Sequence, residues 1–92
     1  MGMEDANKLL AELISRWEIV EEKKIKKTFE FKDFLEAIAF ANKIAEVAEQ
    51  EQHHPDIFIS YNKVTIELWT HAVGGLSEND FILAAKIDQI KL

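Results

Sequence analysis

The chain has 92 residues, of which 48% are hydrophobic and 30% charged, and its formal net charge is −6. This composition is typical of one compact globular domain and excludes a disordered or fibrous protein. The negative charge repels phosphate backbones and anionic lipid surfaces, so we expect neither nucleic acid nor a membrane as a partner.

The sequence contains no cysteine. A disulfide framework, a thiolate nucleophile and a cysteine-bound zinc site are therefore excluded. No apolar run approaches the roughly 20 residues of a membrane-spanning helix, and acidic residues stand at the start of the chain where a signal peptide needs basic ones. We expect a cytoplasmic protein.

The first third of the chain is predicted to form a helix and a hairpin. Leucines and isoleucines at spacings of three and four predict an amphipathic helix within residues 4–15 that ends before Trp17. Apolar and polar residues then alternate over 17–19 and 25–31, which predicts two strands joined by a turn at 21–23.

A central helix is predicted from Asp33 onward, because Asp33 and Glu36 have the spacing of a capping box. An apolar stripe continues it to about residue 51: Phe34, Ala37, Ile38, Ala41, Ile44, Ala45 and Ala48. Pro55 disfavours helical dihedrals at His54, so the helix ends before that residue. His53 and His54 are thus expected where the helix gives way to extended chain.

A second hairpin and a third helix are predicted for the rest of the chain. Alternation over 57–61 and 64–68 indicates two strands with a turn at Asn62-Lys63. Ser77 and Asp80 fit a capping box for a final helix that ends near Ile90. The predicted fold is α+β, in the order α-β-β-α-β-β-α, with three helices on one face of a four-stranded antiparallel sheet.

Two of the three histidines, His53 and His54, are adjacent at the predicted helix end, and Glu49 lies one turn before His53. Histidine exchanges protons near neutral pH, and a neighbouring carboxylate can fix its tautomer or stabilise its cation. Histidines are also common at helix ends for electrostatic reasons alone. Taken by itself, the segment is compatible with either an acid–base site or a polar helix exit.

His71 is predicted to lie outside the core, because strand parity places it on the face opposite Val64, Ile66 and Leu68. Trp69 has the same parity, and a subunit interface would explain a tryptophan on that outer face. The capping box accounts for Asp80 without catalysis.

Taken together, these residues resemble the signature of the pterin-4a-carbinolamine dehydratase family. The matching positions are Glu49, His53, His54, Pro55, Tyr61, His71 and Asp80, with further similarity around Trp17, at 31–34 and at 75–77. Glu67 and Trp69 are not part of that pattern. The resemblance spans nearly the whole chain and implies that residues 1–92 form a single domain of this family.

The resemblance implies dehydration of 4a-hydroxytetrahydropterin to quinonoid dihydropterin without a metal or an organic cofactor. Two proton transfers are needed, one from the ring N5 and one to the departing hydroxyl. His53 and His71 would supply them as base and acid, in an order that stays open, and His54 would hydrogen-bond the substrate. The supporting residues implied by the resemblance are Glu49, Pro55, Asp80 and Trp17.

Three further expectations concern metals and partners. Glu49, His53, His54 and His71 have side chains of metal-ligating type, but the chain lacks the His-Glu-x-x-His pattern. The resemblance also implies an alternative role as an interaction module, a dimerisation cofactor or transcriptional coactivator. A homodimer or homotetramer is expected from the resemblance and from the small core of a 92-residue chain.

Overall fold

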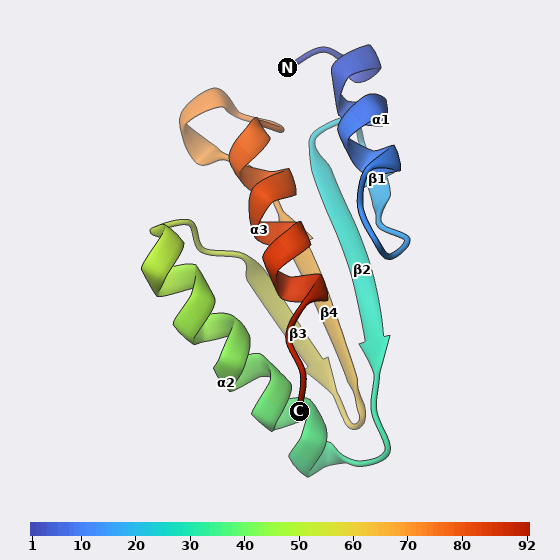
Figure 1. The fold of residues 1–92 in the computed structure, drawn as a ribbon, viewed down its shortest axis with the longest axis vertical. Coiled ribbons are helices and arrows are strands. Elements are labelled where there is room, and N and C mark those ends of the chain that lie inside the picture. The colour runs from blue at the N-terminus through green and yellow to red at the C-terminus, as the bar shows by residue number, and fades with distance from the viewer.

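Three helices pack on one face of a four-stranded antiparallel sheet in the computed structural model, which describes residues 1–92 (Figure 1). The elements are α1 (Met3–Ala11), β1 (Glu18–Val20), β2 (Lys24–Glu30), α2 (Phe34–Glu51), β3 (Asp56–Ser60), β4 (Lys63–Leu68), the 3₁₀ turn η1 (His71–Val73) and α3 (Glu78–Asp88). The predicted α+β class and element order are confirmed. None of the helices is long and apolar enough to cross a membrane.

The sheet has the strand order β1-β2-β4-β3, so the two hairpins join through the pairing of β2 with β4 at the centre. Apolar pairs such as Ile25 with Leu68 point toward the helices, and Ile25, Ile66 and Leu68 are fully buried. Lys26 with Glu67 lies on the other face. The period-2 alternation seen in the sequence therefore separates a buried face from an outer face.

The core-facing stripe of α2 differs from the predicted one. Phe40, absent from the predicted stripe, is buried with its ring centroid 4.8 Å from those of Phe29 and Phe31. Phe34 is 47% exposed and Ala45 is also exposed. Ala37, Ile44 and Ala48 are buried as predicted. Phe40 adds to this face because an aromatic ring buries far more surface than a methyl group.

Several element boundaries also differ from prediction. Each of the four strands is displaced by one residue at one or both ends, and His71, which was placed by strand parity, lies in η1 beyond the end of β4. α1 ends at Ala11, because the chain turns over 12–15 to bring Ser15 into a hydrogen bond with Asp88. The β3–β4 turn is Tyr61-Asn62, since Ser60 pairs with Lys63. α3 ends at Asp88, two residues short of the predicted end.

Candidate active site

The end of α2 places His53 through a defined hydrogen-bonded turn. Gln52 adopts the left-handed conformation with φ 52°, its N–H donates to the Glu49 carbonyl, and the His53 N–H donates to the Ala48 carbonyl at 3.1 Å. This pair of bonds is a Schellman motif, which ends the helix and reverses the chain direction. Pro55 then follows before β3, as the sequence predicts.

The side chain of His53 contacts Asp80 at the start of α3. His53 Nε2 lies 2.6 Å from Asp80 Oδ1, with Asp80 completely buried and the His53 side chain only 15% exposed. An ionised carboxylate only accepts hydrogen bonds, so Nε2 carries the proton. The neutral imidazole therefore keeps a lone pair on Nδ1, where it can accept a proton.

The second carboxylate oxygen of Asp80 holds the loop that follows β4. Asp80 Oδ2 accepts from the Ser77 N–H at 2.9 Å and from the Thr70 hydroxyl at 3.0 Å. Thr70 also forms a bridge with Gly75, and η1 lies between them. Since His71 directly follows Thr70, Asp80 links the His53 side chain to the loop that carries His71.

His54 and Glu49 form a separate pair at the surface. His54 Nε2 lies 2.9 Å from Glu49 Oε2, and their side chains are 64% and 76% exposed. Glu49 therefore contacts His54, while His53 takes Asp80 as its partner. Solvent screens a pair this exposed, so it contributes little to stability.

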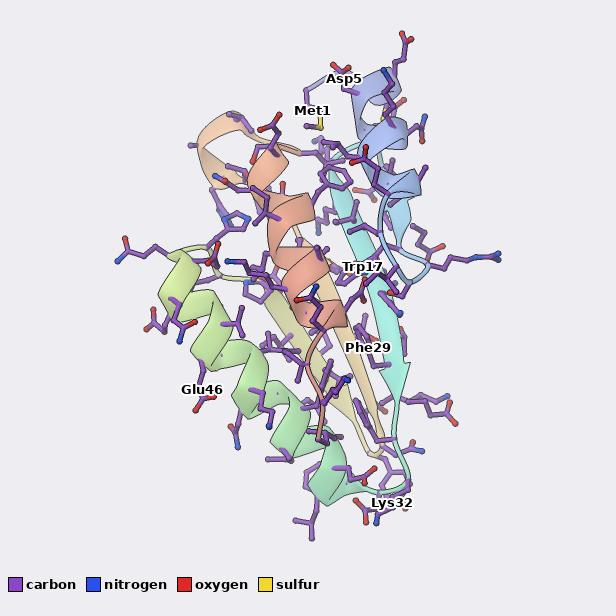
Figure 2. The ribbon with its side chains drawn as sticks, in the orientation of Figure 1. Met1, Asp5, Trp17, Phe29, Lys32 and Glu46 are labelled. Atoms are coloured by element: carbon purple, nitrogen blue, oxygen red, sulfur yellow. The ribbon has the colours of Figure 1, made fainter.

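The structure does not bring Trp17 to the histidines. Trp17 is buried, and its indole N–H donates to the Asp88 carboxylate at 3.1 Å. Residue 88 lies about 12 Å along α3 from residue 80, at the helix rise of roughly 1.5 Å per residue. Figure 2 shows Trp17 beside β2, on the side of the molecule away from the end of α2. Trp17 is thus a core residue in this chain.

Of two further residues, Tyr61 lies outside the site and Thr70 belongs to it. Tyr61 is exposed in the β3–β4 turn, at the opposite end of β4 from His71, so it lies apart from the histidines. Thr70, which sequence reasoning missed, contributes through its hydroxyl contact with Asp80. A threonine at a strand end carries no sequence signal of such a role, because its partner is ten residues away in another element.

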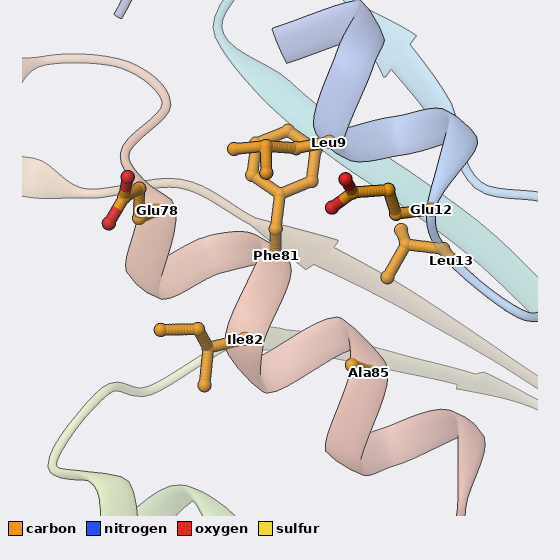
Figure 3. Close-up of a pocket in the computed structure, with 7 residues that line it drawn as sticks. All are labelled: Leu9, Glu12, Leu13, Glu78, Phe81, Ile82 and Ala85. Carbon is orange, nitrogen blue, oxygen red and sulfur yellow. The ribbon is translucent and has the colours of Figure 1, made fainter. Parts of the chain in front are cut away.

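The main groove of the molecule lies elsewhere, between α1 and α3 (Figure 3). It has a volume of about 400 Å³ and is lined by Leu9, Glu12, Leu13, Glu78, Phe81, Ile82 and Ala85. No histidine lines this groove or the three smaller ones. The chain has no group of three or more histidine, cysteine or acidic side chains that could hold a metal ion.

Comparison with known proteins identifies relatives across the whole chain. Residues 1–90 match the family model described as pterin 4 alpha carbinolamine dehydratase. A Rickettsia bellii protein provisionally named pterin-4-alpha-carbinolamine dehydratase is 51% identical over 87 residues, which are 95% of this chain and 77% of the relative. A Nitrosomonas europaea protein of the same provisional name is 49% identical over 90 residues, 98% of this chain and 79% of the relative.

A solved structure agrees with the sequence relatives. The crystal structure of a Brucella melitensis protein, described as a transcriptional coactivator/pterin dehydratase, matches with a TM-score of 0.88 at 35% identity. The match covers 96% of this chain and 94% of that one. Full-length similarity in sequence and in fold leads to one assignment: the chain belongs to the pterin-4a-carbinolamine dehydratase family.

Proposed function

We propose that this protein dehydrates 4a-hydroxytetrahydropterin to quinonoid dihydropterin and water, in tetrahydropterin recycling. The family assignment and the names of relatives at about half identity agree with this hydro-lyase activity. The substrate is a flat, neutral ring with donors and acceptors at its edges. Histidine side chains suit such a ligand, because they form hydrogen bonds and exchange protons near neutral pH.

The reaction breaks one C–O bond and moves two protons. A base removes the proton from N5, and the electron pair of the N5–H bond turns the N5–C4a single bond into a double bond. The C4a–O bond breaks, and an acid protonates the hydroxyl so that it leaves as water. Positioned side chains typically accelerate each such proton transfer by about 100- to 10,000-fold.

The contact between His53 and Asp80 is the observation that carries the proposal. The buried carboxylate accepts the Nε2–H hydrogen bond, with Nε2 and Oδ1 2.6 Å apart, and leaves Nδ1 free to accept a proton, which suits His53 to act as the base. A carboxylate in this position also stabilises the imidazolium that forms when Nδ1 takes the substrate proton.

His71 and His54 take the remaining roles in the proposal. His71 is exposed in the loop that Asp80 holds through Thr70, and it protonates the departing hydroxyl. His54, which is also exposed, hydrogen-bonds the pterin and is oriented by Glu49. Pro55 fixes the backbone that leads from His53 and His54, which follow α2, into β3.

The test is a stopped-flow assay of freshly generated carbinolamine, compared with its spontaneous dehydration. We expect the parental protein to exceed the spontaneous rate, and His53→Ala and His71→Ala each to be slower by about 100-fold or more. Lys63→Ala, at the opposite end of β4, is the matched control and keeps the parental rate. A folded histidine variant with near-parental turnover would remove that residue from the mechanism.

A protein-interaction role is the second candidate, because the Brucella melitensis relative is described as a transcriptional coactivator as well as a pterin dehydratase. In that case the chain binds a partner protein as a dimerisation cofactor. A stable complex with a defined partner, combined with dehydration no faster than the spontaneous rate, would place this role ahead of catalysis.

The proposal includes a homodimer or homotetramer in the cytoplasm. β3 is an edge strand, and it exposes Phe58 by 54% and Ile59 by 39%. Unpaired edges with exposed apolar side chains favour association. Light scattering of the parental protein should give a mass that is a multiple of 10.6 kDa. Phe58→Lys should lower this mass, whereas Ile14→Lys, at an exposed residue in the loop after α1, should leave it unchanged. A parental mass of 10.6 kDa contradicts the oligomer.

A further inference from the structure

We propose that Trp69 is a positioning residue that holds the His71 imidazole in the orientation needed for proton transfer. The two rings are stacked, with centroids 3.9 Å apart and planes inclined by 30°. Trp69 lies outside the residue pattern on which the family resemblance was based. The inference rests on the proposed function, because it assigns a support to the acid of that reaction.

Trp69 is itself fixed by side chains from three strands. Its indole N–H donates to Asp56 Oδ2 on β3 at 3.3 Å. Lys24 of β2 lies over the ring, 5.9 Å from its centroid, and is bound to Glu67 of β4 at 3.1 Å. The hydrogen bond that Lys24 donates to Glu67 raises the pKa of Lys24 above its ordinary value, so the ammonium over the indole stays charged at neutral pH.

His71 needs a support of this kind because of where it lies. It is exposed at the start of a short 3₁₀ turn, where a side chain otherwise samples several rotamers. Carboxylates hold His53 and His54, whereas the indole face holds His71. An aromatic face attracts both a neutral imidazole and an imidazolium, so the stack persists as the acid gives up its proton.

Turnover measurements test the inference with a double-mutant cycle. Trp69→Leu should lower kcat roughly tenfold and change KM by no more than about twofold. This loss is smaller than the one expected for His71→Ala, because the histidine itself is still present. Trp69→Phe keeps a ring on His71 and should restore most of the rate. In a His71→Gln background, Trp69→Leu should cause no further loss, because a positioning residue acts only through the group that it positions.

Thr65→Val, on the same outer face of β4, is the matched control and should leave kcat unchanged. An equal loss from Trp69→Leu with and without His71 indicates a general structural role and overturns the inference. Parental kcat in Trp69→Leu also overturns it. Failure of the proposed function is distinguishable, because the parental protein would then not exceed spontaneous dehydration.

Tryptophan fluorescence tests the contact without any substrate. A protonated imidazole quenches a stacked indole, so emission should fall as the pH is lowered through the range in which histidine titrates, from about pH 8 to pH 5. The step should vanish in His71→Gln and persist in His54→Gln. A step that persists without His71, or no step in the parental protein, contradicts the stacked pair.

Discussion

The His53 imidazole and the Asp80 carboxylate meet at 2.6 Å, although 27 residues separate them in the chain. The other oxygen of the same carboxylate accepts from the Ser77 N–H and caps α3. One residue therefore both begins a helix and holds the proposed base. The cap also explains how a buried carboxylate is tolerated, since the hydrogen bonds to its two oxygens offset the loss of water.

Asp80→Asn should impair both roles, because a carboxamide has one oxygen where the carboxylate has two. If that oxygen stays on Ser77, the amide N–H faces His53 and forces the proton from Nε2 to Nδ1, so the base is lost. If the amide flips, the Ser77 N–H loses its acceptor. We expect kcat to fall by about 100-fold and the free energy of unfolding to fall by about 1–3 kcal/mol.

Stopped-flow turnover and urea denaturation measure these two effects. Asp33→Asn is the matched control, because Asp33 also caps a helix through a carboxylate oxygen but contacts no histidine. Asparagine caps a helix about as well as aspartate. The control should therefore keep both parental kcat and parental stability. If Asp80→Asn keeps parental kcat, the carboxylate does not set the tautomer of a catalytic His53.

His54→Ala should affect substrate binding more than chemistry. Its ring is 64% exposed and paired with Glu49, so it is available to a ligand at little cost in stability. We expect KM to rise about tenfold, as for loss of one hydrogen bond of roughly 1.4 kcal/mol, and kcat to change less. Steady-state kinetics separate the two. Glu49→Gln is the control: its side chain still accepts a hydrogen bond, so it should raise KM less than His54→Ala does. If His54→Ala instead lowers kcat by more than it raises KM, His54 takes part in proton transfer.

Local signals predicted much of this fold because they involve residues a few positions apart. The Asp33 cap accepts from the Glu36 N–H, and α2 ends before His54 as Pro55 predicts, since each effect acts on residues close in the chain. The buried face of α2 was predicted only in part, because Phe40 was missed. It depends on Phe40 packing against Phe29 and Phe31, a contact between elements that periodicity alone does not reveal.

The same distinction applies to the candidate site. The histidines could be singled out from their spacing and from the family resemblance, but their partners could not. Sequence spacing predicts a contact between Glu49 and His53. In the structure, the Schellman turn at Gln52 directs the His53 ring toward Asp80 of α3, and Glu49 contacts His54 instead. The contacts of the two tryptophans were likewise not predicted. The indole N–H of Trp17 donates to Asp88, and that of Trp69 donates to Asp56 while its ring stacks on His71.

Gln52→Gly should stabilise the protein. Gln52 has a φ of 52°, a left-handed conformation that costs a residue with a Cβ about 1 kcal/mol or more and costs glycine nothing. We expect a gain of about 0.5–1 kcal/mol in urea denaturation, with unchanged kcat. Gln50→Gly is the control with the same substitution inside α2, and it should destabilise by about 1 kcal/mol. Equal losses at both positions contradict the left-handed turn.

The second buried aspartate of α3, Asp88, should matter for stability and not for catalysis. Its side chain is 1% exposed, accepts from Ser15 and Trp17, and lies 3.8 Å from Lys27 Nζ. Asp88→Ala strands the Trp17 N–H and the Lys27 charge, so we expect a loss of about 3–5 kcal/mol in the free energy of unfolding.

Adding Lys27→Met to Asp88→Ala should recover part of that loss, because the stranded charge is removed with its partner. The folded fraction of Asp88→Ala should turn over within about twofold of the parental kcat, since residue 88 lies about 12 Å along α3 from the carboxylate that holds His53. Urea denaturation and stopped-flow turnover on the same samples separate the two effects. A fall in kcat as large as that of Asp80→Asn would extend the active site along the whole of α3.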